Sequence, residues 1–233
     1  MAQRALQQKW PTAIVVVLVA GTLALSAALS TGHFGGAVTR ATAATKPSGS
    51  WARELSFLHP GDLVFRRGES VLSAAVMVLD PRSLYSHVGI VVETAGRLSV
   101  VHAVVDEAPD TAGSVRADSI PDFLSPDRAA AVAVYRLRGE IPEYNERTEL
   151  ASRIAAGYAS RHVPFDRDFD LGTADAVYCT ELIWRAYRGA GIELVSGELP
   201  TISFCLKRRR AILPSTLQNS AKLRLIWQTS ERN

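Results

Sequence analysis

Hydrophobic and polar residues follow a strand-like pattern in four segments of the chain. These segments, rich in β-branched residues and bounded by turn signals, are residues 61–65, 85–93, 98–105 and 130–137. A loop of residues 94–97 that contains a glycine joins the second segment to the third and predicts a hairpin. If the hairpin closes through this loop, Glu93 pairs with Leu98. Counting back along both strands then places Gly89 opposite His102.

Helical spacing marks three further segments. They are residues 69–79, 142–160 and 178–188. Asp80 and Pro81 end the first helix, and Gly189 and Gly191 end the last. Residues 162–177 are irregular and acidic. A meander of strands flanked by helices predicts an α+β fold.

Residues 1–30 have the pattern of a transmembrane anchor or a signal peptide. No charge interrupts residues 12–30, and Arg4 and Lys9 precede them. An apolar run of about 18–20 residues crosses a bilayer as a helix, and positive residues before it favour a cytoplasmic N-terminus. We therefore expect a single-pass protein in the cell membrane whose domain lies on the extracytoplasmic side, or a secreted protein if the segment is cleaved.

The rest of the chain divides into a tether and a domain. Residues 31–50 are rich in Gly, Ala, Thr and Ser and predict a flexible tether, so the domain comprises residues 51–233. The chain is 47% hydrophobic and 21% charged, which excludes a disordered protein. The net charge is only +3, and the single dense basic run, Lys207 to Arg210, is too short for a nucleic-acid-binding face. This run is expected to be solvated.

Cys179 is a candidate nucleophile. It opens the helix predicted at 178–188, on the face that it shares with Leu182, Ile183, Ala186, Tyr187 and Ala190. The free N–H groups and dipole at a helix start favour a thiolate, so we expect a lowered thiol pKa there. The alternative is an inert buried thiol. A disulfide to Cys205 is not expected, because it would disable the nucleophile.

Two histidines are candidates for the base and its orienting group. His87 lies in an otherwise apolar strand, where an ionisable side chain needs a partner. The predicted register places His102 diagonal to it on the same face, with Gly89 leaving room between them. A thiolate, an imidazole and a third polar group are the set used in nucleophilic acyl transfer.

These residues fall in motifs that resemble the circularly permuted NlpC/P60 hydrolases, and more narrowly the YiiX/YebB-type papain-like amidases. The motifs are Gly61–Phe65 (GDLVF), Tyr85–Ile90 (YSHVGI) and Tyr178–Trp184 (YCTELIW). The resemblance covers residues 58–227. It implies a permuted papain-like fold with an antiparallel sheet packed against helices, Cys179 as nucleophile, His87 as base, and His102 as the third residue, where many members have Glu.

Residues near this set are candidates for substrate contact. Tyr178 stands beside the nucleophile, Tyr85 opens the histidine motif, and Asp166 falls in a segment that resembles the loop lining the family's cleft. Glu181 and Arg185 are four residues apart on the other helix face and predict a surface ion pair.

The sequence therefore predicts a cysteine hydrolase of amidase or peptidase type that forms an acyl-enzyme outside the cytoplasmic membrane. Its substrate is expected to be a peptide, cell-wall or lipid-derived amide, with no cofactor, metal or nucleic acid. Lipid acyl hydrolysis or thioesterase chemistry on the same residues is the alternative within enzymes. Outside enzymes the alternatives are an idle binding module and a zinc protein that uses His87, His102 and Cys179 as ligands.

Overall fold

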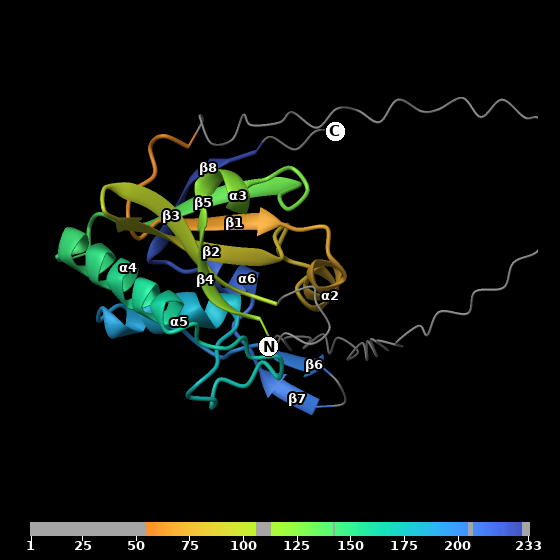
Figure 1. The fold of residues 1–233 in the computed structure, drawn as a ribbon. Helices are drawn as coiled ribbons and strands as arrows, with labels where there is room; N and C mark the ends of the chain where they lie inside the picture. Colours follow the sequence, from red (N-terminus) through yellow and green to blue (C-terminus); the bar gives the residue numbers. More distant parts are fainter. Residues whose placement is uncertain (1–54, 106–112, 142, 205–206, 230–233) are drawn as a thin grey trace, which may run out of the picture.

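A six-stranded antiparallel sheet forms the centre of the computed structural model (Figure 1). Its strands follow the spatial order β4-β3-β2-β1-β5-β8. Their bounds are β1 Leu63–Arg67, β2 His87–Thr94, β3 Arg97–Val104, β4 Ser114–Ser119, β5 Ala131–Leu137 and β8 Leu223–Gln228. The structure describes residues 55–105, 113–141, 143–204 and 207–229. The predicted anchor at 1–30 and tether at 31–50 lie outside these residues, and no helix within them is long and apolar enough to span a membrane.

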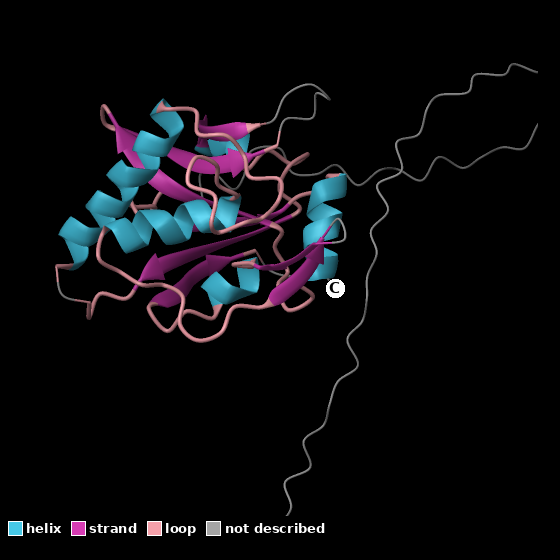
Figure 2. Cartoon of the chain, turned by 90° about the horizontal axis from the view of Figure 1, so that it is seen from below, coloured by secondary structure: helices cyan, strands magenta, loops and turns pink. Residues whose placement is uncertain are grey.

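Helices α4 (Tyr144–Ser160) and α5 (Cys179–Gly189) cover one face of this sheet (Figure 2). The remaining elements are α2 Val71–Leu79, α3 Ile120–Phe123, α6 Pro214–Gln218, and a separate hairpin of β6 Thr201–Phe204 and β7 Lys207–Arg210. Sheet and helices together confirm the predicted α+β class.

The predicted hairpin register is confirmed. Glu93 pairs with Leu98, and Thr94 pairs with Arg97. The connection is therefore a turn of two residues, Ala95 with φ 50° and Gly96 with φ 73°, rather than an open loop of four. Two positive φ angles give a turn whose twist matches that of the flanking strands.

Alternation along the strands divides the core into two layers. Val88 and Ile90 pack toward α4 and α5, together with the apolar face of α5 that the sequence predicts. The neighbouring residue Val91 packs on the opposite face with Val64 and Phe123. His87 is an odd-numbered residue of β2 like Val91, so its side chain belongs to the second face.

A close approach at Gly61 fixes the helices on the sheet. The Tyr187 hydroxyl of α5 donates to the Gly61 carbonyl over 2.5 Å. Gly61 has φ 91°, and a Cβ at this position would lie 2.8 Å from the Thr148 Cβ of α4. Only glycine satisfies both the left-handed backbone and this packing distance.

Candidate active site

Cys179 is the first residue of α5, and the chain around residue 212 holds this helix start in place. The Thr180 hydroxyl donates to the Ile212 carbonyl over 2.6 Å. The Ile212 N–H donates to the Tyr178 hydroxyl over 2.9 Å. These two buried hydrogen bonds bracket Cys179, whose own side chain remains partly exposed.

Opposing effects act on the Cys179 thiol. Burial raises its pKa, whereas the backbone N–H groups of Val88, Thr180 and Cys179 itself and the charge of Arg66 lower it. Burial is the larger effect, and the pKa rises to about 11. The expectation that the helix start lowers the thiol pKa is therefore wrong in its net direction, because three N–H donors do not offset the loss of solvent around the sulfur. The resting group is a neutral thiol.

We predict that this thiol titrates late. The ultraviolet absorbance of the thiolate, taken as the difference between the natural protein and Cys179→Ala, should appear only as the pH approaches about 11. The difference removes the contribution of Cys205, which both proteins contain. Thiolate absorbance at Cys179 below about pH 8.5, the value of a free cysteine, would contradict a neutral resting thiol.

A chain of hydrogen bonds starts at His87. Its Nε2 atom lies 2.8 Å from Nδ1 of His102. The Nε2 atom of His102 lies 3.0 Å from Oδ2 of Asp118. Asp118 stands on β4, whose register pairs His102 with Arg116 and so brings Asp118 diagonally beside His102. The structure thus joins the two predicted histidines and adds a carboxylate that the sequence reading missed.

The carboxylate fixes the protonation of both rings. Burial by itself would raise the pKa of Asp118, but the hydrogen bond from His102, together with the charge and hydrogen bond of Arg116, lowers it to about 2. An ionised carboxylate only accepts hydrogen bonds, so His102 carries its proton on Nε2 and its Nδ1 accepts from His87. His87 consequently carries its proton on Nε2. Its lone pair is on Nδ1.

Both imidazoles are held neutral. Burial lowers the pKa of His87 well below its usual value, and the nearby charge of Arg66 lowers it further. Burial also lowers the pKa of His102, although Asp118 opposes this change. A neutral His87 has a free lone pair at physiological pH, as a general base requires.

Phe123 and Arg66 enclose the histidine pair. The Phe123 ring lies 5.9 Å from the His87 ring and 5.0 Å from the His102 ring, measured between centroids. The Arg66 guanidinium lies 4.3 Å from the centre of the same phenyl ring and donates to the Phe123 carbonyl. Arg66 pairs directly with His87 in the β1–β2 register, which places its charge on the histidine face.

Cys179 contacts the backbone of β2 next to His87. Helix α5 packs on the face opposite to the histidine rings. Its first residue nevertheless reaches the start of β2, where the Val88 N–H donates to the Cys179 sulfur. Val88 directly follows His87, so the backbone contact of the nucleophile candidate lies one residue from the base candidate.

The three residues predicted to bind substrate are buried. Tyr178, Tyr85 and Asp166 are only 2%, 5% and 5% exposed. The two carboxylate oxygens of Asp166 accept from the N–H groups of Asp168 and Asp170 over 2.8 and 2.6 Å, so Asp166 shapes its loop. The hydroxyl of Tyr178 already accepts from Ile212, and its ring packs against Phe169. These side chains lie in the interior of the domain and offer little surface to a ligand.

Glu181 is buried, whereas the sequence predicted it in a surface ion pair. Its predicted ion pair with Arg185 exists, at 2.7 Å between Oε1 and Nη2, but Glu181 is fully buried and not on the surface. Burial raises the pKa of Glu181 to about 7, although Arg185 opposes this change. Its Oε2 accepts from the Tyr178 N–H over 3.3 Å, which makes Glu181 a cap for the helix that begins at Cys179.

The basic run and the second cysteine do not join the site. Strand β7 is largely exposed, and its Lys207 and Arg209 lie 3.1 and 3.5 Å from Asp168 and Asp170. Cys205 lies outside the described residues. Within the described part of the chain, no group of three or more His, Cys, Asp or Glu side chains is arranged to hold a metal ion.

Comparison with known proteins identifies the family. Residues 57–226 match the sequence profile of the permuted papain-like amidase enzymes, the YaeF/YiiX or C92 family. A similar solved structure, described as the metalloprotein yiiX from Escherichia coli O157:H7, is 20% identical, with a TM-score of 0.58, and the match covers 73% of this chain and 97% of that chain. No curated protein matches the sequence. The chain belongs to the permuted papain-like amidase family of YaeF and YiiX.

Proposed function

We propose that this protein is a cysteine hydrolase in which Cys179 attacks a carbonyl carbon and His87 is the base. The supporting observation is the hydrogen-bond chain from His87 through His102 to Asp118, which leaves a lone pair on Nδ1 of His87. The partly exposed Cys179 is hydrogen-bonded to the backbone of Val88, the residue that follows His87. A base whose tautomer is fixed by a third group is the arrangement that activates nucleophiles in acyl transfer.

Because both groups rest neutral, the proton moves during the attack. The thiol proton passes to Nδ1 of His87 as sulfur bonds to the carbonyl carbon. His87, now an imidazolium, gives this proton to the leaving amine, and the C–N bond breaks to leave a thioester on Cys179. Water then attacks the thioester while His87 takes one of its protons. Collapse of this second adduct breaks the C–S bond and releases the acid. The leaving sulfur takes the proton from His87, which restores the thiol and the neutral imidazole.

Backbone N–H groups at the sulfur support the charged intermediates. The N–H groups of Cys179, Thr180 and Val88 all favour negative charge at the Cys179 side chain in the resting protein. When sulfur bonds to carbon, the negative charge moves to the former carbonyl oxygen next to it. Fixed N–H donors in a site largely closed to water stabilise such an oxyanion strongly.

The sequence and the family together support a proposal for location and substrate. The amidase description of the family favours an amide substrate, and the anchor predicted at residues 12–30 favours a domain outside the cytoplasmic membrane. We therefore propose cell-wall peptide as the substrate class. Lipid-derived amides and thioesters are the alternatives that the same chemistry accepts.

The test is capture of the acyl-enzyme from a matched panel. The full chain is incubated with acyl amides, esters and thioesters that share one acyl group, and intact mass is recorded at early times. We expect an added acyl mass that maps to Cys179 and decays by hydrolysis, with amides among the substrates turned over. Product release from every panel member without acylation of Cys179 would contradict the mechanism.

A further inference from the structure

Helix α2 carries an apolar face that points to solvent. Val71, Ala74 and Val78 are spaced as neighbours on one side of a helix, and all three are exposed. Val71 is 80% exposed and Val78 is 52% exposed, and no residue of the helix is buried. Soluble proteins normally turn such a stripe toward the core. We call these three side chains the α2 face.

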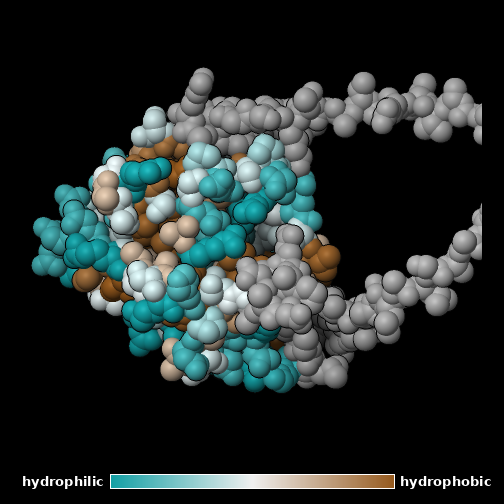
Figure 3. Space-filling view, viewed as in Figure 1, coloured by the Kyte–Doolittle hydropathy of each residue, from teal (hydrophilic) through white to brown (hydrophobic). Residues whose placement is uncertain are grey.

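The helix is fixed in this orientation at both ends. At its start, the Ser70 hydroxyl accepts from the Ser73 N–H over 3.1 Å. At its end, the buried carboxylate of Asp80 accepts from the Ser215 N–H over 2.7 Å, which ties α2 to α6. The outward apolar stripe is therefore a built feature of the fold. Figure 3 shows hydrophobic atoms at the surface at the end of the molecule where α2 lies.

We propose that the α2 face inserts into the surface of the lipid bilayer in which the sequence predicts the anchor at residues 12–30. Reach favours this occupant. The tether predicted at residues 31–50 would span roughly 25 Å end to end as a flexible chain, whereas a domain of about 180 residues has a radius of gyration of roughly 16 Å. Such a tether would keep the domain close enough to the membrane for one of its faces to contact it.

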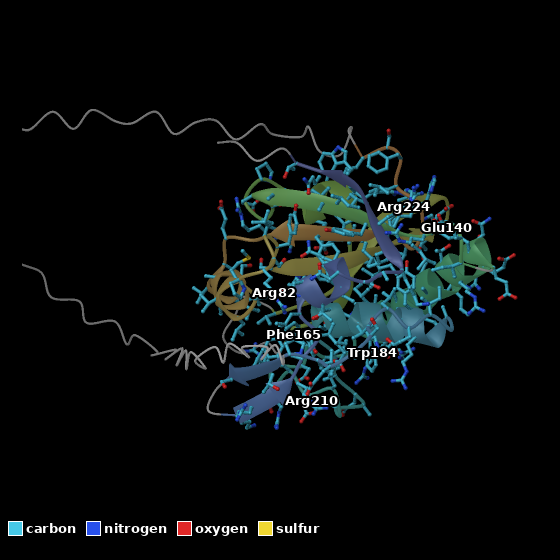
Figure 4. All side chains as sticks on the ribbon, turned by 180° about the vertical axis from the view of Figure 1, so that it is seen from behind. Arg82, Glu140, Phe165, Trp184, Arg210 and Arg224 are labelled. Atoms are coloured by element: carbon cyan, nitrogen blue, oxygen red, sulfur yellow. The ribbon has the colours of Figure 1, made fainter. Side chains whose placement is uncertain are left out.

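Charge and position also favour a bilayer over a protein partner. Exposed Arg67 and Arg82 flank the α2 face, with one exposed acidic residue, Glu69, also at its start, and Arg82 lies beside the helix in Figure 4. An apolar stripe with arginines at its borders matches the acyl and headgroup layers of an anionic membrane. The basic strand β7 lies at the same end of the domain (Figures 1 and 4).

Docking through α2 would set the orientation of the whole domain. Helix α2 lies in the connection from the end of β1 at Arg67 to the start of β2 at His87, so it stands at the end of these two central strands where the histidine chain begins. The same end would face the membrane. The inference concerns this surface alone and does not depend on hydrolysis.

Depth-dependent fluorescence quenching tests the proposal on the full chain. Val71→Trp and Val78→Trp are reconstituted in vesicles of phosphatidylcholine and phosphatidylglycerol, with and without bromine on the acyl chains. Leu150→Trp is the matched control, since Leu150 is also exposed, at 38%, but lies on α4. After subtraction of the natural tryptophans, brominated lipid should quench the α2 positions about twofold and leave position 150 unchanged.

Equal quenching at all three positions, or none at Val71→Trp, would overturn the proposal. A blue-shifted emission at position 71 without quenching would also overturn it, because it would mean that protein covers the α2 face. A second variant tests the stripe as a unit. Val78→Asp in the Val71→Trp background should abolish the quenching while circular dichroism shows an unchanged fold.

Discussion

Replacing Cys179 by serine is expected to reduce turnover of the best panel substrate by at least about 10⁴-fold, because the set loses its nucleophile. The exchange is nearly isosteric, so the hydrogen bonds that hold the start of α5 should persist. A serine hydroxyl is a far weaker acid than even the raised thiol, and a neutral His87 cannot deprotonate it effectively. Initial rates and acyl-enzyme mass are the two measurements.

The second cysteine provides the matched control. Cys205→Ser should keep both turnover and acylation, since the mechanism assigns Cys205 no role. Retention of substantial turnover in Cys179→Ser, with loss in Cys205→Ser, would transfer the nucleophile to the other sulfur. Retention in both variants would remove cysteine chemistry from the proposal altogether.

Alanine at successive members of the hydrogen-bond chain is expected to give a graded loss. His87→Ala should cost about 10³- to 10⁴-fold in kcat, because it removes the base itself. His102→Ala should cost less, about 10²-fold, and Asp118→Ala about 10-fold, because both act on the reaction through His87. The Cys179 acylation rate and kcat should fall in the same order.

Combining Asp118→Ala with His102→Ala distinguishes a positioning role of Asp118 from a general loss of stability. Asp118 contacts His87 only through His102, so Asp118→Ala should add almost nothing once His102 is already alanine. Asp127→Asn is the control. Asp127 lines the same surface hollow as Asp118, but its side chain is 75% exposed and it takes no part in the hydrogen-bond chain from His87 to Asp118. Full additivity of His102→Ala and Asp118→Ala would mean that Asp118 acts elsewhere.

Hydrophobic periodicity and turn signals in the sequence were sufficient to predict the elements that carry the candidate catalytic residues. Alternation over 85–105 predicted the register that sets His87 diagonal to His102, because a strand period of two leaves little freedom once the turn is placed. Helical spacing after Cys179 predicted the buried face of α5. Leu182 and Ile183 are three and four residues further along, so they lie on the same side of the helix as Cys179, and both pack in the core.

No comparable signal in the sequence marks Asp118. Strand β4 is short and half polar, so it lacks the run of β-branched residues that marks the other strands. Its carboxylate matters only because β4 adds to the edge of β3 and brings Asp118 beside His102. Long-range strand pairing of this kind is not encoded in local periodicity. Ser119, the N-cap of α3, and Pro121 in its first turn are local signals that a helix begins after this strand.

Local sequence thus determined which residue types stand at a helix start and on one face of a hairpin, because spacing alone fixes both. The tertiary structure decided their ionisation. Burial overrides the helix-start effect at Cys179 and raises the pKa of Glu181, and desolvation depends on every element packed around a group. It also decided that the apolar residues of α2 face outward, since their spacing is the same whichever side the core lies on.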